Sequence, residues 1–364
     1  MSTTTRVRSF RAGGFESRVV SARDLSAQEV GAWENYCGSF PHLASAFFSP
    51  RYTQAAADAR NRVYVCVLFQ AGRIAGFLPF QFRDALHEWM GCAERVGGEM
   101  TDYFGLIADP GLRISANELL RLAGLNHLYF THLDESQLMH GLSGEHPEVG
   151  LRLSLEPGGD TWRGQLRERD PKLVSESGRL ERSLERQFGA LRFCFAETAW
   201  SEPLRNLIRW KGEQYLRTGA MNSFAEPWRV RLLETLAGAQ QTNCTGVLSS
   251  LHAGETWVAS HFGLRSGPVL HYWFPVYNPD LRKFAPGRLL LKNVIQCAPD
   301  AGIGLIDRGA GDTHAKRQLT NQEHRFYRGA WYRHGIRSAA FRLHLSLKWR
   351  MEGFAKATGN GGAE

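Results

Sequence analysis

The chain has 364 residues, of which 43% are hydrophobic and 22% are charged, and its formal net charge at pH 7 is +8. These values suit a globular protein with room for two domains, and the basic balance favours anionic partners such as nucleotides, CoA phosphates, nucleic acid, acidic glycans or an anionic membrane face. No stretch approaches the roughly 18 apolar residues of a membrane span, and the N-terminus lacks the apolar core of a secretory signal. We therefore expect a cytoplasmic protein.

The cysteine and histidine pattern argues against a metal centre. The six cysteines are scattered, and no two stand at CxxC spacing. His314 and His324 are isolated. Zinc and redox sites need closely spaced ligands, so the sequence predicts no metal cofactor and a reducing compartment. Neither a Gly-x-Ser-x-Gly elbow nor a Walker-type loop is present.

Two similar hairpins stand far apart in the chain. Residues 63–69 and 74–82 have the β-branched and aromatic content of strands and flank a turn with Ala-Gly. Residues 247–251 and 257–264 repeat this design, again around Ala-Gly. The repetition favours duplication of one unit, although hairpins are common.

The second hairpin begins a recognisable order of elements. Apolar and β-branched patterns predict strands and helices in the following order: strand 269–277, loop 278–287, helix 288–298, strand 304–307, Gly-rich loop 308–312, short helix 314–319 and strand 326–332. Upstream, a turn-rich break at 156–160 precedes a basic helical stretch at 172–193. These features divide the chain into a disordered tail 1–18, an N-terminal domain 19–158, a C-terminal domain 159–350 and a disordered tail 351–364.

Several short motifs carry a resemblance to a known family. They are Phe47-Phe48-Ser49-Pro50 with Tyr52, Ile74 to Pro79, Thr101-Asp102-Tyr103, Trp162 with the basic helix, Tyr277-Asn278-Pro279 to Phe284-Ala285-Pro286-Gly287, and Asp307 to Asp312 with Lys316. In this order and spacing the chain resembles the double-GNAT, Fem-like acetyltransferases associated with cellulose and exopolysaccharide biosynthesis, from about Leu25 to Trp331. Asn278, Ala285 and Ala315 depart from the family's usual Asp, Ser and Tyr.

The resemblance implies an α/β (α+β) fold. Two tandem GNAT-like domains are expected, each with a mixed, mostly antiparallel sheet flanked by helices. The acyl donor, acetyl-CoA or another acyl-CoA, is expected in the C-terminal domain, and acceptor-binding residues are expected in the N-terminal one.

The donor site is predicted at the start of the helix after the central strand. A helix N-terminus presents free N–H groups and partial positive charge, which suit a pyrophosphate. Pro286 and Gly287 stand at that start, and Arg288 adds charge. Lys316 is a candidate for neutralising a phosphate or an acceptor carboxylate. The alternatives are an ordinary helix start and surface basic residues.

Three residues are candidates for the general base. Asp307 ends an apolar strand beside a Gly-rich loop, His261 lies inside a strand and titrates near neutrality, and Asp102 could reach a cleft between the halves. Their structural alternatives are a turn cap, a core histidine and a strand entry, respectively.

Candidate acceptor contacts are Tyr103, Tyr272, Tyr277 and Arg179. For Arg179, which belongs to the basic helix with Arg182 and Arg186, a solvated helix face is the alternative.

Three functions remain open. The first is acyl-CoA-dependent N- or O-acylation of a sugar, sugar nucleotide or cell-surface polysaccharide precursor, with nucleic acid not expected as a partner and peripheral association with membrane-bound polysaccharide machinery left open. The second is Fem-type aminoacyl transfer from charged tRNA, which the net charge permits. The third is a non-catalytic GNAT pair that binds a glycan or an assembly partner. The sequence leaves the oligomeric state undetermined.

Overall fold

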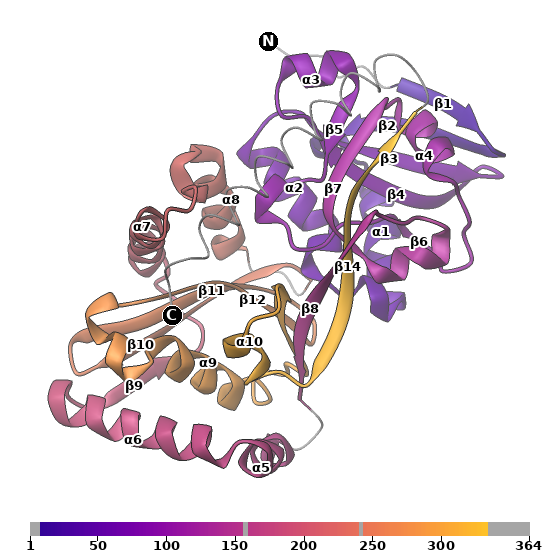
Figure 1. The fold of residues 1–364 in the computed structure, drawn as a ribbon. Coiled ribbons are helices and arrows are strands. Elements are labelled where there is room, and N and C mark those ends of the chain that lie inside the picture. The colour runs from indigo at the N-terminus through magenta and orange to yellow at the C-terminus, as the bar shows by residue number, and fades with distance from the viewer. Residues whose placement is uncertain (1–7, 156–158, 240–242, 334–364) are drawn as a thin grey trace.

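A computed structural model describes residues 8–155, 159–239 and 243–333. Within them the strands form one mixed sheet of 14 strands that runs through both halves of the molecule (Figure 1). The strand order is β1-β2-β3-β4-β5-β7-β14-β8-β13-β12-β11-β10-β9, with β6 paired to β4. No helix in the described ranges is long and apolar enough to cross a bilayer.

The N-terminal half contains the following helices and strands: β1 (Arg8–Ala12), β2 (Phe15–Ser21), α1 (Ala27–Ser39), α2 (Pro50–Ala59), β3 (Val63–Gln70), β4 (Arg73–Gln81), α3 (Ala85–Met90), β5 (Cys92–Glu94), β6 (Ile107–Ala108), α4 (Ala116–Ala123), β7 (His127–Asp134) and β8 (His146–Ser154).

The C-terminal half contains α5 (Gly159–Arg169), α6 (Pro171–Phe188), β9 (Leu191–Cys194), α7 (Ser201–Arg217), α8 (Pro227–Gly238), β10 (Thr245–Ala253), β11 (Thr256–Ser266), β12 (Val269–Tyr277), α9 (Pro286–Cys297), β13 (Leu305–Ala310), α10 (His314–Arg317) and β14 (Gln322–Tyr332). The two predicted hairpins are confirmed as β3–β4 and β10–β11.

The expectation of a disordered tail at 1–18 is wrong for residues 8–18. Strands β1 and β2 form an antiparallel hairpin there, and β2 pairs with β3. Phe15 and Val19 are buried, so apolar burial and ladder hydrogen bonds offset the entropy of ordering this segment. The predicted tail 351–364 lies outside the described residues.

The predicted loop at 308–312 is shorter than expected. Strand β13 continues to Ala310, beyond the predicted strand end at Asp307. Register with β8 is interrupted between Asp307 and Ala310. The glycine-rich sequence therefore forms an irregular strand end rather than a full loop.

The two halves exchange strands at the centre of the sheet. β8 follows β7 in the chain but pairs with β13 of the C-terminal half, and β14, the last described strand, pairs with β7 and β8 (Figure 1). A boundary near residue 158 therefore does not coincide with a break in the sheet. The exchange brings side chains from distant parts of the sequence to one place.

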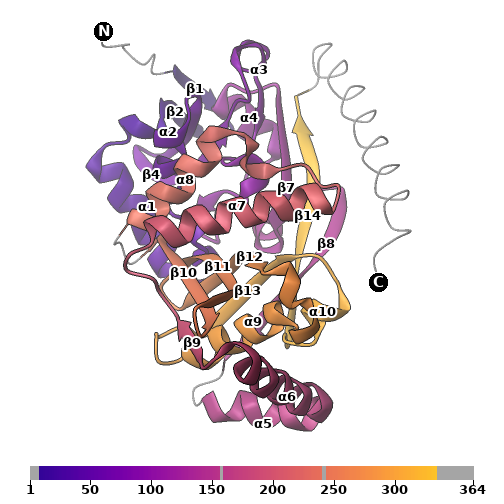
Figure 2. The same ribbon diagram turned by 90° about the vertical axis from the view of Figure 1, so that its left-hand side faces the viewer.

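Helices cover both faces of the C-terminal part of the sheet. α9 packs on β10–β12 and is covered by α6, whereas α7 and α8 lie on the other face (Figure 2). The core on the α7–α8 side also includes Phe48, Tyr52 and other residues of the N-terminal half. The halves thus share one apolar core, which fixes their relative position.

A wedge opens between two parallel strands of the C-terminal half. β12 and β13 pair only from Val269–His271 to Leu305–Asp307, although β12 continues to Tyr277. At the point where they part, Tyr272 and Trp273 form a bulge opposite Gly263 of β11. A bulge leaves a residue unpaired and re-aims its neighbours. The helix after β12, α9, begins beside the last residue of β12, since a β-carbon on Gly287 would lie 3.7 Å from Tyr277 Cδ1.

Candidate active site

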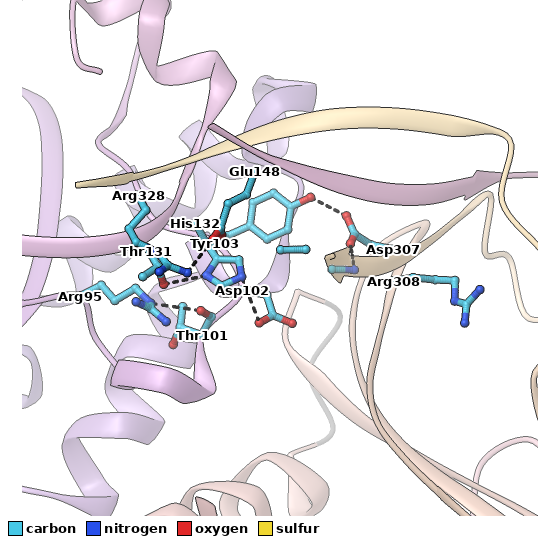
Figure 3. A network of polar contacts seen from close by, with 12 residues as sticks. Arg95, Thr101, Asp102, Tyr103, Thr131, His132, Glu148, Asp307, Arg308 and Arg328 are labelled. Carbon is cyan, nitrogen blue, oxygen red and sulfur yellow. Dashed lines mark hydrogen bonds and ion pairs between the residues drawn. The ribbon is translucent and has the colours of Figure 1, made fainter. Parts of the chain in front are cut away.

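A hydrogen-bonded network joins the two halves where β12 and β13 part. The Tyr103 hydroxyl donates to Asp307 Oδ2 at 2.5 Å (Figure 3). Arg152 Nε donates to the same oxygen at 2.9 Å, and the backbone N–H of Gly309 donates to Asp307 Oδ1 at 2.7 Å. Both oxygens of this buried carboxylate are therefore occupied by donors.

Asp307 is held in its ionised form. Burial opposes the charge, but His271, His324, Arg152 and the Tyr103 hydroxyl outweigh it and lower its pKa to about 2. A carboxylate whose acceptor sites are filled and whose pKa is low is a weak proton acceptor near neutrality. The geometry suits Asp307 to positioning its neighbours more than to taking a proton.

Tyr103 is the centre of this network. Its pKa is raised well above the usual range by burial and by Asp307, so the hydroxyl stays protonated. Its one proton goes to Asp307, and it accepts a hydrogen bond from Arg152 Nη2. His324 Nε2 lies 3.1 Å from the same oxygen and must be the donor there, since a hydroxyl has a single proton.

Two members of the network come from the exchanged strands. Arg152 lies on β8 and His324 on β14. Sequence reasoning did not select Arg152 and treated His324 only as an isolated histidine without metal-ligand spacing. No local signal marks them, because Arg152 meets Asp307, and His324 meets Tyr103, across more than a hundred residues of the chain.

Asp102, the neighbour of Tyr103, has surroundings that differ from those of Asp307. Its side chain is 25% exposed, and His132 Nε2 lies 4.0 Å from Asp102 Oδ1 (Figure 3). Burial and the charge of Asp307 raise the pKa of Asp102 to about 7, although Arg95 and Lys316 act in the opposite direction. A carboxylate with a pKa near the working pH is suited to general base catalysis.

A bulge in β7 aims His132 at Asp102. Leu133 pairs with Tyr327 and Phe130 with Gly329, so Thr131 and His132 both lie opposite one residue of β14. His132 has a left-handed backbone, with φ of 59°, which is unfavourable for a non-glycine residue. Burial lowers the pKa of His132 well below its usual value, as do the charges of Arg95 and Arg328, so the imidazole is neutral.

Lys316 approaches the same place from the C-terminal half. Its Nζ donates to the carbonyls of Arg308, at 2.9 Å, and Ala310, at 2.6 Å, at the end of β13. In the same segment Gly309 has φ of 66°, and a β-carbon there would lie 3.2 Å from Asp102 Oδ2. Glycine thus allows β13 to approach Asp102. The sequence-predicted residues Asp102, Tyr103, Asp307 and Lys316 are therefore brought together.

A cavity of about 260 Å³ lies on the Tyr103 side of this network. Its lining includes Ser45, Tyr103, Arg152, His271 and Asp307. His271 Nε2 is 3.0 Å from Ser45 Oγ, and burial lowers the His271 pKa to about 4. The cavity is therefore lined by hydrogen-bonding groups from both halves.

His261 and Tyr272 lie elsewhere. The His261 ring stacks on Tyr272 with centroids 4.3 Å apart, and His261 Nδ1 is 3.2 Å from Ser249 Oγ. Tyr272 belongs to the core under α9. Burial lowers the pKa of His261 to about 3. The structure thus places both residues in the core, apart from the Tyr103–Asp307 network.

The predicted donor residues gather at the start of α9. Pro286 is buried in the first turn, and a β-carbon on Gly287 would lie 3.7 Å from Tyr277 Cδ1. Ala285, the N-cap residue, carries no side-chain oxygen that could cap the helix. Arg288 is bound by Glu176 of α6 at 3.1 Å, so part of its charge is already neutralised.

Arg179 lies away from this site. It is exposed on α6, whose buried residues Leu173 and Leu184 belong to the core formed with α9 and the sheet. The structure therefore brings Arg179 near neither Tyr103 nor Asp307.

Comparison with known proteins shows a GNAT domain in the C-terminal half and solved structures of similar fold. Residues 173–317 match the family model described as Acetyltransferase (GNAT) domain. The crystal structure of FemX is similar with a TM-score of 0.57 and 9% identity, over 86% of this chain and 98% of that chain. The C-terminal domain of a putative lysylphosphatidylglycerol synthetase from Agrobacterium fabrum is similar with a TM-score of 0.51 and 12% identity, over 88% and 96%. No curated protein sequence matches.

A tandem GNAT protein from the clavulanic acid biosynthesis pathway is also similar, with a TM-score of 0.45 and 14% identity, over 88% of this chain and 100% of that chain. At these identities the structural likenesses describe the fold alone. The predicted fold class, a mixed and mostly antiparallel sheet flanked by helices, is confirmed, with a GNAT domain in the C-terminal half. The sheet is continuous through both halves, whereas a separate sheet was expected in each.

Proposed function

We propose that the protein is an acyl-CoA-dependent N- or O-acyltransferase acting on a sugar, a sugar nucleotide or a cell-surface polysaccharide precursor. The observation that carries the proposal is the wedge between β12 and β13 in the segment that matches the GNAT domain, together with the start of α9, where Gly287 lies next to Tyr277 at the end of β12. The wedge and the helix start suit an extended thioester donor with an anionic pyrophosphate.

Asp102 is the general base in this proposal. It takes a proton from the acceptor's amine or hydroxyl, which attacks the thioester carbonyl. A new C–N or C–O bond forms, the C–S bond breaks, and the CoA thiolate leaves and is protonated from Asp102 or solvent. Asp307, Arg152 and Tyr103 position Asp102 and β13 through the hydrogen bonds described above. Positioning of this kind can supply a large share of a rate enhancement.

The donor site can be tested by calorimetric titration of acetyl-CoA and longer acyl-CoAs into wild type and Gly287→Asp. A carboxylate there would repel the pyrophosphate, whereas the space beside Tyr277 accepts a β-carbon at ordinary contact distance, so the variant should fold. Gly31→Asp, on an exposed position of α1 with open space around it, is the matched control.

We expect wild type and Gly31→Asp to bind and Gly287→Asp to lose binding. Failure of wild type to bind any acyl-CoA would contradict the proposal. Charged tRNA would then be the next donor to titrate, because Fem-type aminoacyl transfer is the competing proposal for this fold.

A further inference from the structure

A second cavity lies between the N-terminal sheet and α8, on the far side of Asp102 from β13. Its volume is about 330 Å³. We call it the arginine pocket, and its lining residues are Arg60, Arg83, Glu94, Arg95, Gly98, Glu99, Tyr129, Thr131, His132, Glu226, Trp228, Arg229 and Arg328. Five arginines thus face three glutamates.

The glutamates do not neutralise all of this charge. Arg229 is paired with Glu99, at 3.4 Å, and with Glu226, at 3.2 Å. Glu94 accepts a hydrogen bond from Gln81 at 2.7 Å. Glu94 keeps its negative charge, and Arg328 is paired with Glu148, outside the lining, at 2.6 Å. The lining therefore retains a small excess of positive charge, which Arg60, Arg83 and Arg95 share.

Arg95 is the most unusual of these arginines. It is only 4% exposed, yet within the described ranges its side chain makes no ion pair, and the one hydrogen bond recorded for that side chain joins Nε to the Thr101 carbonyl at 3.1 Å. Burial lowers its pKa. A buried guanidinium with unused donors is costly unless it serves a ligand.

Arg60, another lining residue, is fixed by its contacts with the protein. Its Nη2 donates to the carbonyls of Phe82 and Arg83, and its guanidinium lies 4.8 Å from the centre of the Trp228 ring. The first turn of α8, with Trp228, also lines the pocket and adds the partial positive charge of a helix N-terminus. Fixed guanidinium forks match the oxygens of phosphate and carboxylate groups.

One residue of the pocket lining, His132, also contacts the candidate base. His132 Nε2 is 4.0 Å from Asp102 Oδ1 (Figure 3). Arg95 is bonded to Thr101, which precedes Asp102 in the chain. We propose that the arginine pocket binds an oxyanion of the acceptor, a phosphate or carboxylate, and thereby places the acceptor's nucleophile at Asp102. This deepens the acyltransferase proposal and rests on it.

Calorimetric titration of inorganic phosphate, pyrophosphate and malonate tests this pocket and separates phosphate from carboxylate recognition. The variants are Arg95→Gln and Arg60→Gln, and the control is Arg113→Gln, an exposed arginine that bonds only to loop carbonyls in the described structure. Removing a charge-assisted bond should weaken oxyanion binding about tenfold or more, and the control should match wild type. Arg95→Gln changes a buried residue and could prevent folding. In that case the anion binding of Arg60→Gln alone tests the proposal.

The inference is overturned if wild type binds none of the three anions, or if Arg60→Gln binds them as wild type does. Gly287→Asp should keep oxyanion binding, and its loss there would place the anion at α9 instead. Acyl-CoA binding without oxyanion binding would reject only the arginine pocket. If the protein bound oxyanions but no acyl-CoA, the proposed acyl-CoA donor would be rejected and the arginine pocket would stand.

Discussion

Asp307 and Asp102 are two carboxylates of one site that the fold treats in opposite ways. Asp307 receives three hydrogen bonds, from Tyr103, Arg152 and Gly309, and its pKa falls to about 2. Asp102 has one long contact, with His132, and its pKa rises to about 7. Environments that drive two pKa values apart commonly separate a fixed charge from a proton acceptor. The difference assigns positioning to Asp307 and proton transfer to Asp102.

The largest effect that we expect is a loss of turnover in the variant Asp102→Asn. The amide cannot accept the proton, so the rate of acyl transfer should fall about 10²–10⁴-fold. In wild type the rate should rise with pH through about 7 as Asp102 ionises, and the variant should lose this limb. Initial rates between pH 5 and 9 measure both. Asp58→Asn, an exposed carboxylate on α2, is the control. A variant that keeps the pH limb would contradict the assignment.

The next effect is on stability. Asp307→Asn removes the closer carboxylate partner of Arg152 in a largely buried site and leaves only the longer contact with Asp134, at 3.9 Å. Breaking a buried pair costs about 3–5 kcal/mol, so we expect a loss toward the lower end of this range. Urea unfolding at pH 7 measures the change. Asp312→Asn, an exposed aspartate near the end of β13 that is paired with Arg317, should have little effect. If the two variants were equally stable, Asp307 would not be the anchor that its hydrogen bonds indicate.

The comparison also shows what local sequence can predict. The hairpins β3–β4 and β10–β11, strand β12 and helix α9 follow from periodicity and turn residues, which are local signals. The exchange of β8 and β14 depends on pairing between segments more than a hundred residues apart, so Arg152 and His324 could not be selected. For the same reason the sequence could propose Asp307 as a base but could not count the donors that saturate it.

The strained backbone at His132 is another feature that depends on contacts between distant parts of the chain. A bulge and a positive φ are set by the pairing of β7 with β14, and nothing in Thr131-His132 alone predicts them. Such strain is typical of functional positions, where surrounding structure maintains it. The residues that build the Asp102 environment were thus the least visible in the sequence.

The smallest expected effect is on the thermal stability of the protein, which the raised pKa of Asp102 should lower at high pH. Since its folded-state pKa is raised to about 7 from an ordinary value near 4, the folded protein holds a proton between these pH values that the unfolded chain releases. Its charge therefore opposes folding increasingly as pH rises from about 4 to 7, and the penalty stays constant above that. Asp102→Asn removes the penalty, so the variant should melt a few degrees above wild type at pH 8, and the two should converge near pH 4. Thermal unfolding at both pH values measures this, with Asp58→Asn as the reference. A variant less stable than wild type at pH 8 would mean that the Asp102 carboxylate is a structural partner, and the contrast with Asp307 would no longer hold.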